Sequence, residues 1–573
     1  MKFSKILMAA AAASTLMLSS CYDLDRYPDY SLSAGTFFKT EAHAKQAMMA
    51  VYSQMQNDNV YGYAGFSLDC LGGISFGYDN PSFQTIQRGT VAVNAAYFSN
   101  FWTYIYEGVA RANNVLQNID GCDMTDQLKA QYIGEAKFMR AVYYFYLLNL
   151  YGGVPLYDET TIIAEEFTEM KKPRSSEEEV RNFIIADLDA AESSLPASWD
   201  AANAGRATSG AATALKGKVL LFGKQYQAAS DCFSKVINSG KYALYPDYEG
   251  LFLPGGDESS EMIFAIQNLG GVGQDIGMPM CFYLGARAAY GSCWNNVMPA
   301  TSFVDSYEWA DGRPFNWDEV FPGYNANNSV KAEVWYSTPN SSKTAILEYT
   351  PHKDALLEMY SKRDPRMATS IILPYTNYDG WANNKDHVFE FAIFKGMGIP
   401  NNGAYINVNG NHEAYLWRKF VPKGNMNGAI NNRADTPINF PLIRFADVLL
   451  MQAECLNELG KQSDAVALIN QVRSRAGMPG LNSGPDYLAA NGKDEVFNRI
   501  RHERAVELAC EGHSYFDMKR WGLLQTLNGR REWYITGSKS LYTRSVTDRD
   551  MYWPIPSGEI DKNPELVQNP GWQ

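Results

Sequence analysis

The same helical pattern occurs twice, in residues 209–240 (SGAATALKGKVLLFGKQYQAASDCFSKVINSG) and in residues 442–477 (LIRFADVLLMQAECLNELGKQSDAVALINQVRSRAG). When Gly223 is aligned with Gly460, a Lys-Gln pair follows in both stretches, and a second glycine follows after 17 residues. Each stretch reads as an apolar helix, a glycine turn, a second helix with a small residue at the helix contact, and a glycine stop. The pattern therefore predicts an antiparallel helix pair in each stretch.

A helix pair of this layout is typical of the tetratricopeptide repeat, which is about 34 residues long. Glycine allows a positive φ in the turn, and the aligned Ala228 and Ala465 allow the two helices to pack closely. A chance helix hairpin is the alternative interpretation. Because the aligned glycines are 237 residues apart, the repeats do not form a plain tandem array, and long insertions must interrupt them.

Apolar residues recur at helical spacing in three more segments, residues 101–119, 127–150 and 175–195. In the last of these, Ser176 and Glu179 are placed as a capping box. We therefore expect a mainly α protein, in which a tetratricopeptide-like helical-repeat scaffold carries long irregular, loop-rich insertions. Residues 21–573 are expected to form a single body with helical repeats at approximately 36–56, 101–240 and 442–530, insertions at approximately 57–100 and 250–440, and a C-terminal tail at 550–573.

Composition narrows the classes of function. The chain has 573 residues, of which 46% are hydrophobic and 20% charged, so it is globular and not disordered. Its net charge of −13 has the wrong sign for binding phosphates, and we expect no nucleic acid partner. Aromatic residues make up 13%, and Tyr and Trp suit surfaces that are both apolar and wet.

The first twenty residues read as a secretory signal. Lys2 and Lys5 precede an apolar run that ends at Leu18, which is too short to span a bilayer core of about 20 apolar residues. The sequence Leu18-Ser19-Ser20-Cys21 resembles the bacterial lipobox, in which the cysteine becomes the acylated first residue. We expect residues 1–20 to be a lipoprotein signal peptide and Cys21 to be the site of lipid attachment. An ordinary signal peptide that ends near a cysteine is the alternative.

The motifs that could carry catalysis are weak. Residues 73–77 match the GxSxG pattern, but Tyr78-Asp79-Asn80-Pro81 cannot begin the helix that a nucleophile elbow needs, so we expect a tight loop. His502-Glu503 lacks the second histidine of a zinc-protease helix. No metal site or cofactor is expected, and the seven cysteines beyond Cys21 have the wrong number and spacing for a disulfide framework.

Three ordered stretches resemble the SusD/RagB family. The first is EAKFMRAVYYFYLLNLYGGVPL in residues 135–156, and the second is RHERAVEL in residues 501–508, followed by residues 511–522. The third is the C-terminal PIP of residues 554–556 with QNPGW of residues 568–572. Together with Cys21 and the two repeats, the resemblance runs from end to end. His513-Ser514 departs from the His-Arg that the family often has.

The charged residues within these three stretches are better explained by structure than by ligand binding. They lie at helical spacings among apolar neighbours, which favours ion pairs between helices over a binding role. The residues are Glu135, Arg140, Glu503, Arg504, Glu507, Asp517 and Arg520.

The resemblance implies a non-catalytic surface lipoprotein of the outer membrane, facing the cell exterior. Such a protein captures an oligosaccharide or polysaccharide and delivers it to a SusC-like TonB-dependent transporter. It implies four tetratricopeptide-like units that face the transporter and a ligand site in the irregular part. A RagB-like peptide-binding import lipoprotein is the second possibility, and a surface glycosidase is the third.

Aromatic and polar residues outside the predicted helices are the candidates for glycan contact, because flat rings suit the apolar face of a sugar and polar groups suit its hydroxyls. We expect three or more of them to line the site. They are Tyr61, Tyr63, Asp69, Tyr78, Asn80 and Phe83 in the first insertion, and Tyr290, Trp294, Asn295, Trp335, Tyr336, Arg366 and Trp381 in the second.

Overall fold

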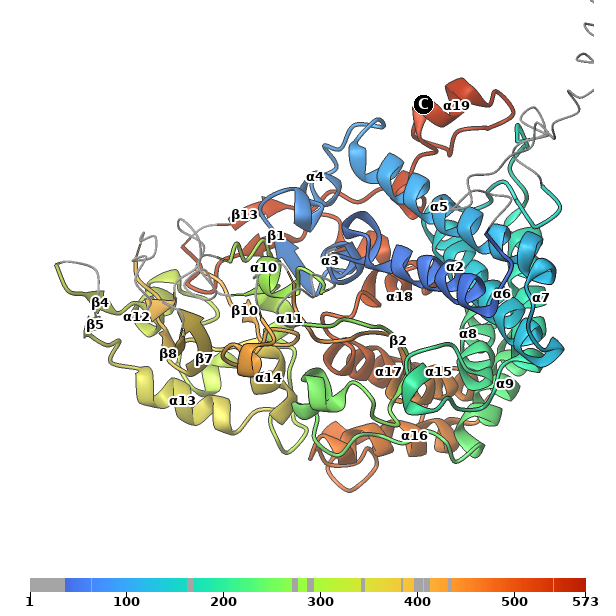
Figure 1. Ribbon diagram of the computed structural model, residues 1–573. Helices are drawn as coiled ribbons and strands as arrows, with labels where there is room; N and C mark the ends of the chain where they lie inside the picture. The colour runs from blue at the N-terminus through green and yellow to red at the C-terminus, as the bar shows by residue number, and fades with distance from the viewer. Residues whose placement is uncertain are drawn as a thin grey trace, which may run out of the picture.

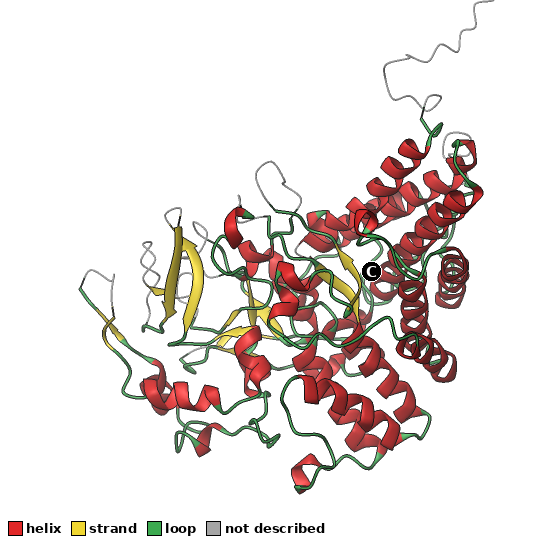
Figure 2. Ribbon diagram, turned by 60° about the horizontal axis from the view of Figure 1, so that its bottom comes forward, coloured by secondary structure: helices red, strands yellow, loops and turns green. Residues whose placement is uncertain are grey.

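The computed structural model shows a helical body on one side and a loop-rich part on the other (Figure 1). A second view shows that the long helices gather together, while most of the short strands lie to one side of them and a few lie directly beside them (Figure 2). The mainly α fold that the sequence predicts is confirmed. The structure describes residues 37–573 except 63, 162–169, 271–276, 286–292, 342–345, 383–384, 396–404, 407–412, 431–434 and 539.

The helical body contains the longer helices, most of which pack on their neighbour in sequence. They are α2 (Glu41–Ser53), α5 (Ala96–Asn118), α6 (Asp126–Tyr151), α7 (Glu177–Ser194), α8 (Ser209–Phe222), α9 (Tyr226–Asn238), α15 (Phe445–Glu458), α16 (Gln462–Arg475), α17 (Lys493–Glu507) and α18 (Ser514–Arg520).

The two repeats identified in the sequence, α8–α9 and α15–α16, are in direct contact with each other. Helix α9 packs on α15, where the Gln452 side-chain amide donates to the hydroxyls of Ser230 and Ser234 at 3.0 Å each. Lys218 of α8 also pairs with Asp447 of α15 at 3.1 Å. The long insertion therefore leaves the helical scaffold and returns to it.

The turns of the two repeats differ by one residue from the alignment on glycine. Gly460 has a φ of +77°, but in the first repeat Lys224 takes the positive φ, +59°, in place of Gly223. Each second helix begins two residues after the left-handed residue, so the register of α9 is shifted by one. The prediction for Ala228 is therefore wrong: Ala228 is exposed, and Ala229 is the buried counterpart of Ala465.

The three other helices predicted from periodicity are present with adjusted ends. Helix α5 begins at Ala96, five residues before the predicted start, and α6 covers the whole predicted segment. Ser176 caps α7, and its hydroxyl and backbone N–H exchange hydrogen bonds with Glu179, so the predicted capping box is confirmed.

Short helices and two- or three-stranded sheets make up the loop-rich part. The helices are α3 (Ala64–Gly72), α4 (Gln84–Gln87), α10 (Met280–Leu284), α11 (Thr301–Asp305), α12 (Asn328–Trp335), α13 (Lys353–Ser361) and α14 (Pro365–Ser370), with α19 (Ser557–Lys562) in the tail. The antiparallel pairs are β1 (Ser75–Gly77) with β3 (Val297–Pro299), β2 (Met262–Ile266) with β11 (Phe440–Arg444), β4 (Thr338–Pro339) with β5 (Ile346–Glu348), β6 (Ile371–Ile372) with β10 (Leu416–Trp417), and β12 (Arg531–Trp533) with β13 (Ser540–Thr543). The remaining sheet is β7 (Asn377–Ala382), β8 (Lys385–Phe391) and β9 (Tyr405–Ile406), with β8 and β9 parallel.

The β1–β3 pair joins the two insertions, which are more than 200 residues apart in sequence. Phe76 pairs with Met298 and Gly77 pairs with Val297. The residues that follow β1 therefore lie beside the residues that precede β3, and this pairing positions the candidate site.

Most charged residues of the family signatures form buried ion pairs between helices, as predicted, whereas Glu135 of α6 pairs with Arg206 in the loop before α8. Arg140 of α6 binds Asp187 of α7, with Nε to Oδ2 at 2.7 Å. Arg504 of α17 binds Asp447 of α15 at 2.8 Å and Asp517 of α18 at 2.7 Å. These pairs tie the scaffold together, which explains why signatures that identify the fold do not mark the ligand site.

The C-terminal tail packs against the C-terminal end of helix α6. The backbone N–H of Trp553 donates to the carbonyl of Leu150 at 2.7 Å, and the side-chain amide of Asn569 donates to the carbonyl of Tyr151 at 2.9 Å. Trp553 and Trp572 are both buried. None of the helices in the described part of the chain is long and apolar enough to cross a membrane.

Because of a buried lysine on α18, we expect the folded protein to become more stable as the pH rises above 7. Burial lowers the pKa of Lys519 from 10.5 to about 7, so the unfolded chain binds the proton more tightly than the folded one. Stability then rises between pH 7 and pH 10, by up to about 4 kcal/mol. In Lys519→Met this rise should vanish, and melting temperatures at pH 7 and pH 9 would measure it. The exposed Lys562, replaced in the same way, should leave the rise intact.

Candidate functional site

Four aromatic side chains from the two insertions form a surface that we call the aromatic ledge: Tyr78, Phe282, Tyr283 and Trp294. The rings of Phe282 and Trp294 lie 4.7 Å apart at 44°, and those of Phe282 and Tyr283 lie 4.9 Å apart at 60°. The side chain of Trp294 is 43% exposed, whereas most large apolar residues of this protein are buried. The ledge therefore presents an indole to solvent beside rings that are only partly covered.

Backbone and side-chain hydrogen bonds hold the ledge in place. The hydroxyl of Tyr78, the first residue after β1, donates to the carbonyl of Trp294 at 2.7 Å. The backbone N–H of Trp294 donates to the carbonyl of Phe282 at 2.7 Å. Asn295 takes a φ of +43°, an uncommon value that turns the chain between Trp294 and β3. The ring positions thus depend on strand pairing and on a specific turn.

Polar groups surround the rings. The side-chain amide of Asn296 donates to Asp79 at 2.5 Å, and the hydroxyl of Tyr97 donates to the side-chain oxygen of Asn80 at 2.8 Å. Burial raises the pKa of Asp79 to about 6, while the hydrogen bond from Asn296 opposes the shift. Burial also raises the pKa of Tyr283, with a further contribution from the nearby carboxylates of Asp58 and Asp79. Above pH 6, the site therefore offers a carboxylate, amides and phenol hydroxyls next to flat rings.

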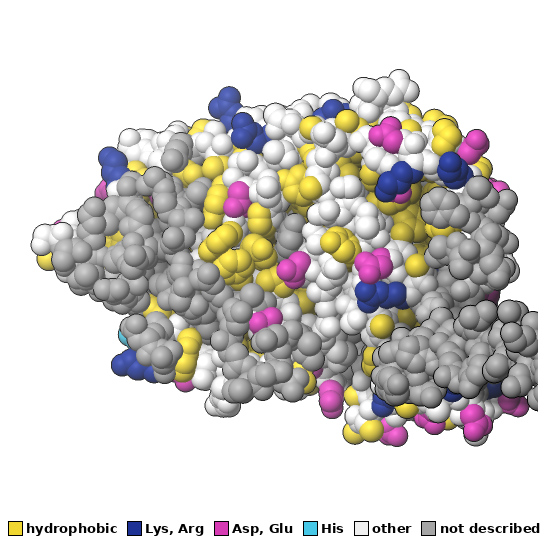
Figure 3. Space-filling model, turned by 45° about the horizontal axis from the view of Figure 1, so that its top comes forward, with side chains coloured by type: hydrophobic (Ala, Val, Ile, Leu, Met, Phe, Trp, Pro, Cys, Tyr) yellow, Lys and Arg dark blue, Asp and Glu magenta, His cyan; other side chains and the backbone are white. Residues whose placement is uncertain are grey.

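This arrangement can bind a molecule that is apolar on one face and hydroxylated at its edges. Figure 3 shows one face of the protein where hydrophobic side chains gather near the middle, with few charged side chains among them. A sugar ring has an apolar C–H face that stacks on an indole or phenol, and hydroxyls that donate to carboxylates and amide oxygens. Catalysis would need a positioned nucleophile or acid–base pair, whereas the ledge provides contact area and hydrogen bonds.

Two of the predicted glycan-contact residues, Tyr78 and Trp294, meet at the ledge, and a third, Asn80, follows Tyr78 by two residues in sequence. Asn80 is exposed, and Tyr78 is half-buried. They come from insertions separated by more than 200 residues, and the β1–β3 pair brings them together.

Six predicted residues have buried side chains and are corrected to core positions, because a side chain enclosed on all sides has no surface for a ligand. Tyr61 packs on Tyr146 at 5.0 Å, and Phe83 packs on Trp553 at 5.9 Å. Asp69 accepts from the backbone N–H groups of Gly512 and Ser514. The full set is Tyr61, Asp69, Phe83, Asn295, Trp335 and Arg366.

The remaining predicted residues lie elsewhere or outside the described residues. Tyr336 is half-buried, and its hydroxyl donates to Glu413 at 2.8 Å. Trp381 lies on β7, in the sheet on the far side of the loop-rich part from the helical body (Figure 1). The lipidation site and two ring candidates lie outside the described residues: Cys21, Tyr63 and Tyr290.

Sequence reasoning missed Phe282, Tyr283, Asp79 and Tyr97, and also the buried Asn296, which has no surface for a ligand but donates to Asp79. Asp79 and Asn296 are direct neighbours of predicted residues, so extending each cluster by one position would have included them. Phe282 and Tyr283 are adjacent aromatic residues within the second insertion, so the same search for aromatic residues could have included them. Tyr97 could be found only from the structure, in which its hydroxyl donates to the side-chain oxygen of Asn80.

The GxSxG segment does not have the geometry of a nucleophile elbow. Ser75 lies in β1 and is buried, and helix α3 precedes it. The chemistry requires the opposite order, with a strand before the serine and a helix after it. The expected tight loop is likewise corrected to a paired strand.

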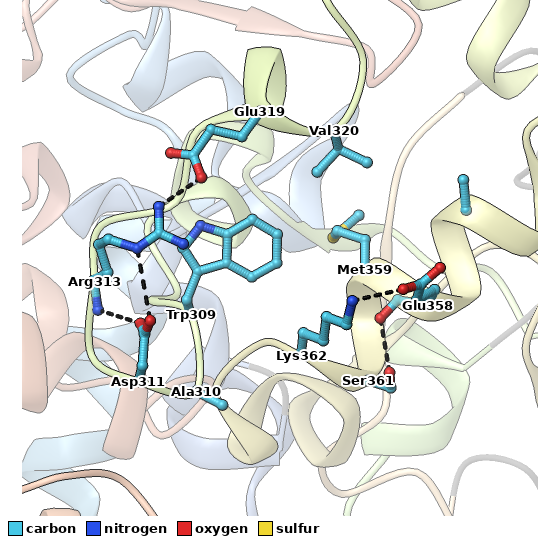
Figure 4. Close-up of a pocket in the computed structure, with 11 residues that line it drawn as sticks. Trp309, Ala310, Asp311, Arg313, Glu319, Val320, Glu358, Met359, Ser361 and Lys362 are labelled. Carbon is cyan, nitrogen blue, oxygen red and sulfur yellow. Dashed lines mark hydrogen bonds and ion pairs between the residues drawn. The ribbon is translucent and has the colours of Figure 1, made fainter.

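A cavity of about 750 Å³ opens between α13 and the 309–320 segment (Figure 4). Its charged side chains pair with one another: Arg313 binds Glu319 at 2.6 Å, and Lys362 binds Glu358 at 2.6 Å. Trp309 is only 9% exposed, so little of its ring is available for stacking. The ledge, with its exposed Trp294, is therefore the stronger candidate for a glycan site.

The chain matches two family models. One, described as the SusD family, matches residues 260–572, and the other, described as starch-binding associating with outer membrane, matches residues 24–221. Among curated relatives, "SusD-like protein P25" of Formosa agariphila is 25% identical, with 96% of each chain covered. The "Starch-binding protein SusD" of Bacteroides thetaiotaomicron is 22% identical over the whole of both chains.

Solved structures agree with this assignment at the level of the fold. A SusD-like carbohydrate binding protein from Bacteroides fragilis is 24% identical, with a TM-score of 0.74 over 93% of this chain and 100% of the other. A laminarin binding SusD-like protein is 23% identical, with a TM-score of 0.61 over 93% and 100%. The family models between them cover both the helical body and the loop-rich part, and the chain described here belongs to the SusD family.

Proposed function

We propose that this protein is a non-catalytic cell-surface receptor that captures an oligosaccharide or polysaccharide on the aromatic ledge. The observation that carries the proposal is the exposed indole of Trp294, which packs on Phe282 at a tilt and accepts a hydrogen bond from Tyr78 at its backbone carbonyl. The carboxylate of Asp79 lies near Tyr283 of the ledge, and the exposed Asn80 follows it in sequence, so both are candidates to accept hydrogen bonds from the hydroxyls of a stacked sugar. The starch-binding and laminarin-binding relatives support a glycan as the ligand class.

The expected affinity is modest. If each stacked ring covers roughly 100 Å² of combined surface, the gross gain is about 2–3 kcal/mol per ring at ~25 cal/mol/Å². Two or three rings with a few hydrogen bonds then give millimolar to micromolar binding, once the cost of association is subtracted. Weak, reversible binding suits a protein that passes its ligand onward.

Anchoring and delivery complete the proposal. Acyl chains on Cys21 would hold the body on the outer membrane, since two or more chains give stable attachment. The captured glycan would then pass to a SusC-like TonB-dependent transporter. The family model that describes association with the outer membrane supports this location.

Calorimetric titration with a panel of glycans tests the proposal. We expect at least one polysaccharide, with starch and laminarin tested first, to bind with a micromolar to millimolar Kd. The same mixtures should show no increase in reducing ends over hours. An increase in reducing ends that is lost on replacing a single carboxylate would show a glycosidase. Binding of oligopeptides without binding of any glycan would show a peptide receptor.

A further inference from the structure

Two buried cysteines lie in contact directly beneath the aromatic ledge. The sulfurs of Cys281 and Cys293 are 3.7 Å apart, and both side chains are at most 1% exposed. Each cysteine precedes a ring of the ledge in sequence, Cys281 before Phe282 and Cys293 before Trp294. A disulfide has a sulfur–sulfur distance of about 2.05 Å, so the two sulfurs must move about 1.7 Å closer to form one.

The backbone around the two cysteines is held from three sides. The N–H of Cys281 donates to the hydroxyl of Thr436 at 2.9 Å. The N–H of Trp294 donates to the carbonyl of Phe282 at 2.7 Å, so the two segments lie side by side next to the sulfurs. The second segment continues into β3, which pairs with β1. The sulfurs therefore meet because both segments are fixed to the scaffold.

We propose that Cys281 and Cys293 form a disulfide in the exported protein and that this bond fixes the spacing of Phe282 and Trp294. The sulfur–sulfur bond forms as each thiol loses its hydrogen. Two protons and two electrons pass to a disulfide oxidant of the thiol–disulfide oxidoreductase class, which is reduced to a dithiol. Disulfides persist in exported proteins because their surroundings are oxidising. Burial of both sulfurs then protects the bond from reductants in the folded state.

The bond would constrain the two rings because each ring adjoins a cysteine. Phe282 directly follows Cys281, and Trp294 directly follows Cys293. A crosslink between the two cysteines restricts the separations that these neighbouring rings can adopt. The value of the bond for ligand capture rests on the proposed glycan binding, and its formation rests on the export to the cell surface that the same proposal includes.

Peptide mapping tests the bond itself. The full chain is exported by its native host, denatured without reduction, alkylated at its free thiols and then digested with trypsin. Arg287 lies between the two cysteines, so trypsin separates them unless a disulfide joins the peptides. We expect a joined species whose mass is about 2 Da below the sum of its two thiol peptides, because two hydrogens have left. Cys281→Ser and Cys293→Ser should each abolish it, and Cys122→Ser should not.

Hydrogen exchange, measured without any glycan, tests whether the disulfide restricts the motion of Trp294 relative to Phe282. In the exported chain, the amide of Trp294 should exchange at least about threefold more slowly than in chain that has been unfolded, reduced and refolded, because the bond restricts opening of the Trp294–Phe282 hydrogen bond. Cys281→Ser should show the fast rate under both conditions. Alkylation of both cysteines in the unreduced, exported chain would overturn the proposed bond. Equal exchange rates in oxidised and reduced chain would overturn its effect on the ledge.

Discussion

A variant with alanine at both Tyr78 and Trp294 is expected to lose glycan retention in affinity electrophoresis. Trp294 supplies the most exposed ring of the ledge, and Tyr78 supplies a second ring and the hydrogen bond to the Trp294 carbonyl. Removing two stacking surfaces should cost at least about 2 kcal/mol of binding free energy, which is roughly a 30-fold loss of affinity. Retention that is unchanged in the double variant would remove the ledge as the binding site.

Two control variants separate stacking from other effects. Tyr78→Phe keeps the ring and removes only the hydroxyl, so it should retain most of the binding. Tyr349→Ala removes an aromatic side chain of similar exposure, 40%, that pairs with Glu390 in a different part of the molecule. It should bind as the unmodified protein does. Melting temperatures for all variants show whether loss of binding reflects loss of folding.

The replacement Glu507→Gln is expected to have the largest effect on stability. The carboxylate of Glu507 is fully buried on α17 and accepts from Arg366 at 3.2 Å, from Arg444 at 2.7 Å and from Arg475. Neutralising it leaves buried guanidinium groups without their shared anion. Such a loss costs about 3–5 kcal/mol, and urea unfolding should show a matching fall in the unfolding midpoint.

The exposed pair Glu358–Lys362 provides the matched control. Glu358→Gln removes a carboxylate at a similar distance from its cation, but both side chains lie in solvent, and we expect no measurable change in the midpoint. A Glu507→Gln variant as stable as the Glu358→Gln variant would contradict the importance of the buried network.

Acid pH should weaken the same network. Neighbouring Arg366 and Arg473 overcome the effect of burial and lower the pKa of Glu503 to about 2, and the pKa of Glu507 is lowered as well. Because the folded-state pKa lies below the unfolded value near 4.5, this stability is fully present above pH 4.5 and is lost as the pH falls toward 2. Melting temperatures should therefore fall steeply over that window.

The sequence was informative where structure is local. Glycine spacing and apolar periodicity located both repeats, and Ser176 with Glu179 marked the start of α7. The sequence was less informative about the register of the second helix in the first repeat. Lys224, and not Gly223, adopts the left-handed conformation in the turn, so helix α9 begins one residue later than the alignment predicts. Of the predicted contact residues, Tyr78 and Trp294 meet at one surface, whereas Tyr61, Phe83 and Trp335 pack in the core.

The sequence by itself determined the family, the helix pairs and the class of side chain at the site, because these follow from spacing along the chain and from composition. Only the tertiary structure decided which rings share a surface. Aromatic residues in the insertions have no periodicity that distinguishes an exposed ring from a core ring. The pairing of β1 with β3 brings Tyr78 to Trp294 and places Cys281 beside Cys293, and such contacts depend on how distant segments pack.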